Sequence, residues 1–159
     1  MNPTIIIYTD GSCHTQQQLG AWSAIILVND TKIILSGIET NTTHQRMELT
    51  AVISAIEYVQ QHYKTSKNIQ LNSDSQYVIG LISRADKLAA KNYKKKKGNE
   101  IANENLVKKW LFLNSLYIIE CIKIKAHQQL SETTKYNIEV DKLSRKLVRD
   151  EIRKGNQNL

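Results

Sequence analysis

Residues 5–13, with the sequence IIIYTDGSC, begin with an apolar run that predicts a buried strand and then reach Asp10. A carboxylate at the end of such a strand is costly unless a hydrogen-bond donor, a cation or a metal ion lies beside it. The alternative is a simple turn, because Asp-Gly is a common turn dipeptide. The role of Asp10 therefore depends on which residues the fold brings next to it.

The composition of the chain is typical of one compact α/β domain. Its 159 residues are enough for a sizeable core, 41% of them are hydrophobic, and one is proline. We expect a single domain over residues 1–159, with an ordered core at about residues 4–154 and a short basic and polar C-terminal tail. The apolar segments are too short to span a bilayer and the first residues lack a secretion signal, so we expect a cytoplasmic protein that binds no membrane. We also expect a monomer. Cys13 and Cys121 lack metal-ligand spacing, and we expect no disulfide in that compartment.

Positive charge is concentrated in one segment. The chain has 22 Lys and Arg residues against 15 Asp and Glu residues, a net charge of +7. Between Arg84 and Lys97 there are seven basic residues and one acidic residue, a net charge of +6. Such a patch suits a polyanion, above all a nucleic acid. The alternative is a solvated lysine run on a loop.

The spacing of apolar residues predicts three strands followed by alternating helices and strands. Strands are expected at 4–10, 19–28, 31–38, 68–74 and 117–125, and helices at about 43–63, 75–84, 100–114 and from about 137 onward. Thr42 or Thr43 can cap the first helix, and Gln45 is placed for a capping box with Thr42. This order predicts an α/β fold with a mixed sheet covered by helices.

Four acidic residues are predicted to lie at the ends of these elements. Asp10 and Asp74 each close a strand, whereas Glu48 and Asp141 lie in the first turn of the long helix and of the last helix. If the two strands are parallel neighbours, their carboxylates emerge at the same sheet edge. Crowded carboxylates repel unless a cation neutralises them, and oxygen-only ligands select Mg²⁺ or Mn²⁺. Simpler roles stay open, because Glu48 and Asp141 could interact with helix dipoles and Asp74 could cap the next helix.

Five motifs in order decide between these alternatives. YTDGSC, QRMELTAVISAI, NSDSQYVI, KAHQ and NIEVDKLSR, at these intervals, resemble type 1 ribonuclease H, the bacterial ribonuclease HI family, over residues 4–150. The resemblance implies a ribonuclease H-like fold, in which helices flank a five-stranded mixed sheet with strands 1, 4 and 5 parallel and strand 2 antiparallel. It also implies an endoribonuclease that hydrolyses the RNA strand of RNA/DNA hybrids. Two Mg²⁺ ions per site, or Mn²⁺ in their place, would assist this reaction, which leaves 5′-phosphate and 3′-hydroxyl ends.

The resemblance also implies roles for individual residues. Asp10 would bridge the two ions, Glu48 and Asp74 would complete the ion on the leaving-group side, and Asp141 would complete the ion that holds the attacking water. His127 would assist proton transfer or product release, the alternative being a plain loop residue.

Contacts with the substrate are implied for a larger set of residues. Thr43 and Asn103 would contact a DNA phosphate, Tyr77 a DNA sugar, Cys13, Gln45, Gln76 and Arg145 the RNA strand, and Lys94, Lys95, Lys96 and Lys97 would belong to a basic handle. The alternatives are helix capping for Thr43 and Asn103 and a core position for Tyr77. His44 stands where many family members have Asn, and a neutral imidazole can still donate or accept one hydrogen bond there.

Two other functions are weighed against this one. A non-catalytic nucleic-acid-binding module of the same fold requires the loss of one of the four acids, and all four are present. A related nuclease, such as a junction resolvase or a transposase, shares acids at strand ends. We do not expect it to combine MEL, DSQYV and the spacing from Asn137 to Asp141.

Overall fold

The computed structural model describes residues 2–125 and 129–157. Its elements are β1 (Ile5–His14), β2 (Leu19–Val28), β3 (Thr31–Glu39), α1 (His44–His62), β4 (Asn68–Ser73), α2 (Gln76–Ser83), α3 (Ala85–Ala90), α4 (Glu104–Leu116), β5 (Ile118–Lys123) and α5 (Lys135–Gln157). The strands form one sheet in the order β3-β2-β1-β4-β5. β1 and β4 are parallel, as are β4 and β5, whereas β2 is antiparallel to both of its neighbours. The predicted five-stranded mixed sheet is confirmed.

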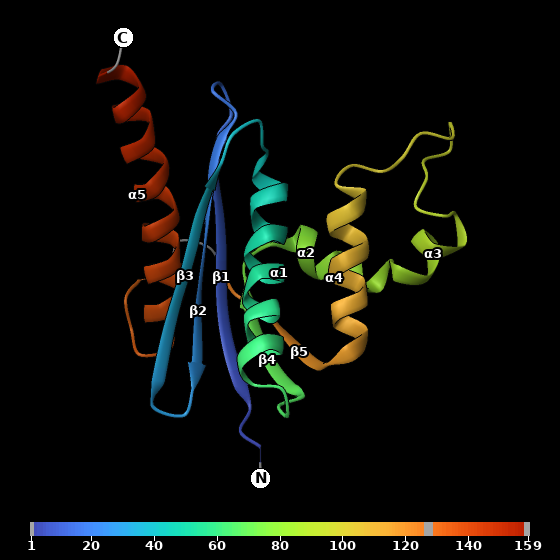
Figure 1. Ribbon diagram of the computed structural model, residues 1–159, viewed down its shortest axis with the longest axis horizontal. Coiled ribbons are helices and arrows are strands. Elements are labelled where there is room, and N and C mark those ends of the chain that lie inside the picture. Colours follow the sequence, from blue (N-terminus) through green and yellow to red (C-terminus); the bar gives the residue numbers. More distant parts are fainter. Residues whose placement is uncertain (1, 126–128, 158–159) are drawn as a thin grey trace.

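Helices cover both faces of this sheet. Figure 1 shows α5 on one side and α1 on the other, with α4 next to α1 and α3 farthest out. The core lies where the fully buried Ile5 and Ile7 of β1 meet the apolar face of α1, including Ile56. The buried Trp110 of α4 donates a hydrogen bond to the Val78 carbonyl of α2 at 3.1 Å, which joins these two helices. No helix in the described ranges is both long and apolar enough to cross a membrane.

β1 continues past Asp10, the residue at which the sequence predicts that this strand ends. Its antiparallel pairing with β2 continues as far as His14, opposite Leu19. The parallel pairing of β1 with β4 stops earlier, at Tyr8 opposite Asn72. Asp10 therefore lies just beyond the part of β1 that is paired on both sides. The expectation that it closes the strand is wrong because β2 keeps the strand extended.

The positively charged segment forms an arm that projects beside α4 (Figure 1). It consists of residues 84–97, which include the helix α3, and we call it the basic arm. The sequence did not predict α3. The next helix begins at Glu104 rather than near residue 100, because Asn103 has a left-handed backbone (φ 57°) and Glu100 forms an isolated bridge with Lys94.

Candidate active site

The start of α1 packs directly against β1 beside Asp10. A Cβ atom on Gly11 would lie 2.5 Å from the backbone nitrogen of Glu48 and 2.6 Å from the carbonyl carbon of Met47. Glycine at this position therefore allows the close approach that places Glu48 near Asp10. Asp10 and Gly11 are both paired with β2 in register, so the Asp-Gly pair is not a turn.

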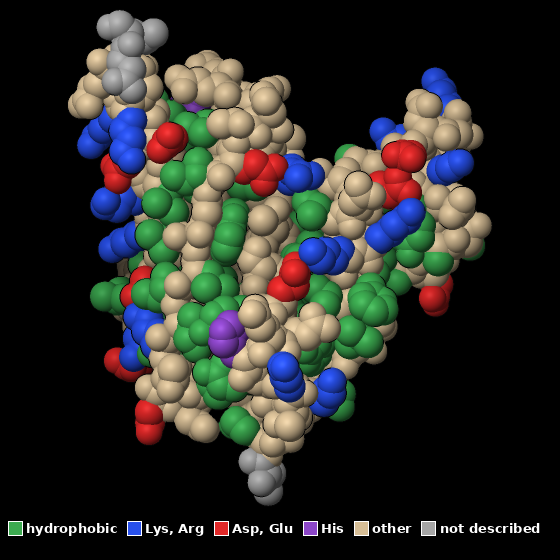
Figure 2. Space-filling view, in the orientation of Figure 1, with side chains coloured by type: hydrophobic (Ala, Val, Ile, Leu, Met, Phe, Trp, Pro, Cys, Tyr) green, Lys and Arg blue, Asp and Glu red, His purple; other side chains and the backbone are tan. Residues whose placement is uncertain are grey.

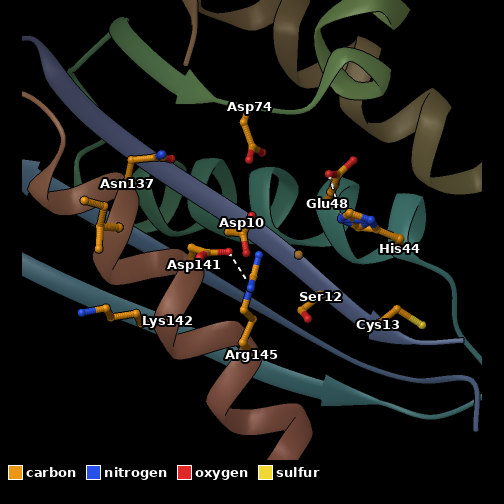
Figure 3. A pocket seen from close by; sticks show the side chains of 12 residues that line it. Asp10, Ser12, Cys13, His44, Glu48, Asp74, Asn137, Asp141, Lys142 and Arg145 are labelled. Carbon is orange, nitrogen blue, oxygen red and sulfur yellow. Dashed lines mark hydrogen bonds and ion pairs between the residues drawn. The ribbon is translucent and has the colours of Figure 1, made fainter. Parts of the chain in front are cut away.

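Four carboxylates face one cavity of about 580 Å³. Asp10 comes from β1, Glu48 from α1, Asp141 from α5, and Asp74 from the position directly after β4. Figure 3 shows these side chains around the space between α5, β1 and the end of β4, with Glu48 beside His44. Among the described residues, no three His, Cys, Asp or Glu side chains are close enough to hold one metal ion as they stand. The four acids are thus neighbours without forming a closed ligand shell.

The simpler explanations of these acids do not hold. Glu48 is the fifth residue of α1 and Asp141 the seventh of α5, and neither helix has an acidic residue in its first turn. Their predicted place in the first turn is therefore wrong, and they lie beyond the turn where the helix dipole acts. Ser75, not Asp74, caps α2 by accepting a hydrogen bond from the Val78 N–H at 3.1 Å.

Asp10 is buried among the other carboxylates. Its pKa is raised to about 7, mainly by burial and further by the charges of Asp74, Asp141 and Glu48. The Oγ of Ser144 donates a hydrogen bond to Oδ2 of Asp10 at 2.5 Å and opposes this rise in pKa. A carboxylate in such surroundings is a favourable place for a cation.

Glu48 is contacted at both of its oxygens. Ser75 Oγ donates to Oε2 at 2.5 Å, and Nε2 of His44 lies 3.1 Å from Oε1. Burial raises the pKa of Glu48, Ser75 and His44 lower it, and the charge of Asp74 raises it again. Because Ser75 directly follows Asp74, the same turn places one acid and orients another.

Arg145 supplies positive charge beside the carboxylates. Its Nε donates to Oδ1 of Asp141 at 2.9 Å, one helical turn away on α5 (Figure 3). This cation is part of the chain, so the charge of Asp141 is offset before any ion from solution binds.

Some of the predicted substrate contacts also reach the cavity. Cys13, His44 and Arg145 line it together with the four acids. Gln76 lies beside Asp74 in a neighbouring cavity of about 520 Å³, which Lys123 and Lys125 also line.

The other predicted contacts lie outside both cavities. Thr43 caps α1, accepting a hydrogen bond from the Arg46 N–H at 3.2 Å. Since Thr42 is not the cap, the predicted capping box with Gln45 does not form. Asn103 and Tyr77 contact each other instead, with Nδ2 3.4 Å from the hydroxyl oxygen. The run Lys94–Lys97 lies in the basic arm, and His127 lies outside the described residues.

Several residues of the site were not predicted. Ser12, Asn137, Ile138 and Lys142 line the cavity, and Ser75 and Ser144 orient carboxylates. Ser144 lies three residues after Asp141, a helical spacing that could have placed it near the site. Nothing in the sequence indicated that its partner is Asp10, 134 residues away.

A mixed sheet of this strand order, with four acids gathered beside its parallel strands β1 and β4, is typical of nucleases of the ribonuclease H-like class. Residues 2–149 match the model of the RNase H family, and the chain belongs to that family. A ribonuclease H of Wolbachia pipientis wMel is 37% identical over 147 residues, covering 92% of this chain and 96% of the relative. One from Thermoanaerobacter sp. (strain X514) is 33% identical over 151 residues, covering 94% and 92%.

Two solved structures are similar to this fold. LC9-RNase H1, a type 1 RNase H with the type 2 active-site motif, has a TM-score of 0.79 at 20% identity, covering 94% of this chain and 74% of that one. A foamy viral protease-reverse transcriptase in complex with dsDNA has a TM-score of 0.74 at 19% identity, covering 92% and 94%. The prediction of a ribonuclease H, an endoribonuclease for RNA/DNA hybrids, is confirmed by the family and its relatives.

Proposed function

We propose that Asp10, Glu48, Asp74 and Asp141 bind two divalent ions, Mg²⁺ in the first place, and that the RNA strand of a hybrid is cleaved between them. The observation that carries this proposal is the convergence of four acids on one cavity, with the pKa of Asp10 raised to about 7 by burial and by the other three. The acids offer only oxygen ligands, which suit a hard divalent ion. Dependence on divalent metal ions is general in this family.

Different residues of the chain orient the carboxylates that are proposed to bind the two ions. Asp10 is electrostatically coupled to all three other acids, which suits the proposed bridging position. Ser144 holds Oδ2 of Asp10, and Ser75 and His44 contact the two oxygens of Glu48, so both carboxylates have a defined orientation. Held by these acids, two divalent ions would offset the negative charge that develops on the scissile phosphate and would favour in-line attack by water. His127 is proposed to assist proton transfer or product release on the resemblance alone.

The hybrid is proposed to lie across the cavity and towards the basic arm. Cys13, His44, Gln45, Gln76 and Arg145 are the proposed contacts with the RNA strand, and Thr43, Asn103, Tyr77 and Lys94–Lys97 those with the DNA strand. The first group is supported by its members that line the two cavities. The second group is supported by the contact between Asn103 and Tyr77, which joins α2 to the start of α4 beside the arm. Action as one domain over residues 1–159, as a monomer in the cytoplasm, remains a prediction from the sequence.

A cleavage assay with four substrates tests this function. The protein is incubated with Mg²⁺ and a labelled RNA/DNA hybrid, duplex DNA, duplex RNA or a four-way junction. We expect cutting of the RNA strand of the hybrid alone, with 5′-phosphate and 3′-hydroxyl ends, and no cutting when a chelator removes the metal. Resolution of the junction, cutting of duplex DNA or undiminished activity in the chelator would contradict the proposal.

A further inference from the structure

The positive charge of the chain lies on two surfaces, and only one of them is the basic arm. Residues 142–154, within α5, contain six basic and two acidic side chains, a net charge of +4. The basic arm carries +6. The remainder of the chain has nine basic and twelve acidic residues and is therefore negative. The excess charge of the protein is confined to the arm and to α5.

Five of the six basic residues of this segment lie on one face of α5. They are Lys142, Arg145, Lys146, Arg149 and Arg153, which we call the α5 stripe. Intervals of three and four residues place them on the same side of the helix, and all five are exposed. The buried residues of α5, among them Ser144 and Val148, face the sheet from the opposite side. Figure 2 shows basic side chains one after another along the edge that α5 forms.

Two of the five residues of the stripe form an ion pair in the part of the chain that the structure describes. Arg145 pairs with Asp141, and Lys146 pairs with Asp150 at 2.8 Å. Lys142, Arg149 and Arg153 form no ion pair within the described ranges. Arg149 and Arg153 interact at longer range with the charge of Asp150, so the five basic residues share two acidic partners and this helix face keeps an excess of positive charge.

The stripe is continuous with the candidate active site. Lys142 and Arg145 line the cavity, and in Figure 3 Arg145 points towards the carboxylates while Lys142 points outward. At 1.5 Å per residue, the helix carries the stripe about 16 Å from Lys142 to Arg153. α5 and the basic arm stand at opposite sides of the molecule (Figure 1), so the two basic surfaces flank the cavity.

We propose that the α5 stripe is a second nucleic-acid contact, which binds backbone phosphates of the substrate on the side of the cavity away from the basic arm. This inference rests on the proposed function. A duplex carries about one negative charge per 1.7 Å of its axis, so it presents several phosphates along a stripe of this length. Continuity with the cavity favours the substrate itself over a separate acidic partner. A hybrid must then be long enough to reach both the basic arm and the α5 stripe if it is to contact both surfaces.

The test compares two variants that remove the same charge from different places. Arg149→Ala/Arg153→Ala removes two charges from the stripe without touching the cavity, and Lys64→Ala/Lys67→Ala removes two exposed charges outside both basic surfaces. Binding of a hybrid of about 20 base pairs is measured without metal over a range of salt concentrations. We expect the log–log salt slope of the stripe variant to flatten by about 1.4 to 1.8, at 0.7 to 0.9 counterions per contact, and that of the control to stay unchanged.

A conservative variant tests whether unfolding, rather than loss of charge, causes the change in salt slope. Arg149→Lys/Arg153→Lys keeps the charge and should keep the wild-type slope, and the melting temperatures of all variants are compared. Equal slopes for the stripe variant and the control would overturn the inference. Equal flattening would show that only the net charge of the protein matters, and no flattening would show that the stripe does not contact the hybrid. Cleavage of the hybrid by the wild type is measured separately. Its failure would refute the proposed function, while the binding slopes would still decide whether the stripe contacts nucleic acid.

Discussion

The carboxylate cavity and the basic arm are built in opposite ways. In the cavity, Asp10 is buried and is oriented by a hydroxyl from a distant element, Ser144. In the arm, the lysines are exposed, and their loop is held by local contacts such as that between the Lys95 N–H and the Asn99 carbonyl at 2.6 Å. The function of the cavity therefore depends on the exact positions of its side chains, whereas the function of the arm depends on its number of positive charges. Substitutions should change turnover in the first region and binding in the second.

The largest effect is expected for Asp10→Asn. The substitution keeps the shape of the side chain but removes the charge that is coupled to all three other acids. We expect cleavage to be lost while binding of the hybrid is largely retained, because the substrate is held by other groups. Single-turnover cleavage and equilibrium binding on the same hybrid measure the two effects. Near-normal turnover would rule out the mechanism.

The same variant should change how stability depends on pH. Without metal, the folded protein holds a proton on Asp10 up to about pH 7, whereas the unfolded chain releases it near the ordinary pKa of 3.8. Asp10 therefore lowers the stability of the wild type progressively as the pH rises from about 4 to 7. The melting temperature of Asp10→Asn in a chelator should match the wild type at low pH and exceed it at neutral pH. A constant difference across this range would contradict the raised pKa.

The next largest effect is expected for Ser144→Ala. Losing the hydroxyl frees Oδ2 of Asp10, and loss of a group that orients a metal ligand typically costs about 10- to 100-fold in metal affinity or activity. Ser23→Ala is a matched control, because Ser23 is also buried and lies opposite Asp10 on β2, but its hydroxyl donates a 2.7 Å hydrogen bond to the Val140 carbonyl of α5 rather than to a carboxylate. Calorimetric titration with Mg²⁺ and the Mg²⁺ dependence of cleavage should separate the two variants. Equal losses in both would reduce Ser144 to a packing role.

The contrast between the two regions also explains what could be predicted from the sequence. The place of Asp74 could be predicted because an apolar strand followed by a carboxylate is a local pattern. The choice of all four acids as site residues came from the five motifs that resemble ribonuclease H, because Glu48 and Asp141 lie in helices and carry no such pattern. The extension of β1 past Asp10 could not be predicted, because it depends on pairing with β2. The hydrogen bond from Ser144 joins residues that no local pattern relates. The spacing of the basic residues of the α5 stripe is visible in the sequence, but only the structure shows that the stripe begins at the cavity.

A smaller effect, on binding alone, is expected for the basic arm. Replacing Lys94–Lys97 with Ala should flatten the log–log salt slope of hybrid binding by about 2 to 3, at roughly 0.7 to 0.9 counterions per contact. KM should rise with little change in kcat, because these contacts form equally in the ground and transition states. Replacing the four lysines with Arg keeps the charge and should keep the slope. An unchanged slope in the Ala variant would show that the lysine run is merely a solvated loop.

The smallest effect concerns the discrimination between RNA and DNA. The scissile phosphate is the same in both, so the choice must come from groups that meet the 2′-hydroxyls, such as Gln76 in the cavity next to Asp74. Gln76→Ala should lower kcat/KM on hybrids by about 1 kcal/mol, the size of one lost hydrogen bond. Gln61→Ala, an exposed residue near the far end of α1, should leave kcat/KM unchanged.

Several 2′-hydroxyl contacts must form together for such small terms to give strict discrimination. We therefore expect a single ribonucleotide within duplex DNA to be cut poorly and a run of about four to be cut well. The same four-ribonucleotide substrate should show the loss caused by Gln76→Ala, whereas the poorly cut single site should show less of it, since fewer contacts are in place to be lost. Efficient cutting at a lone ribonucleotide by the wild type would mean that the metal site, rather than these side chains, selects the RNA strand.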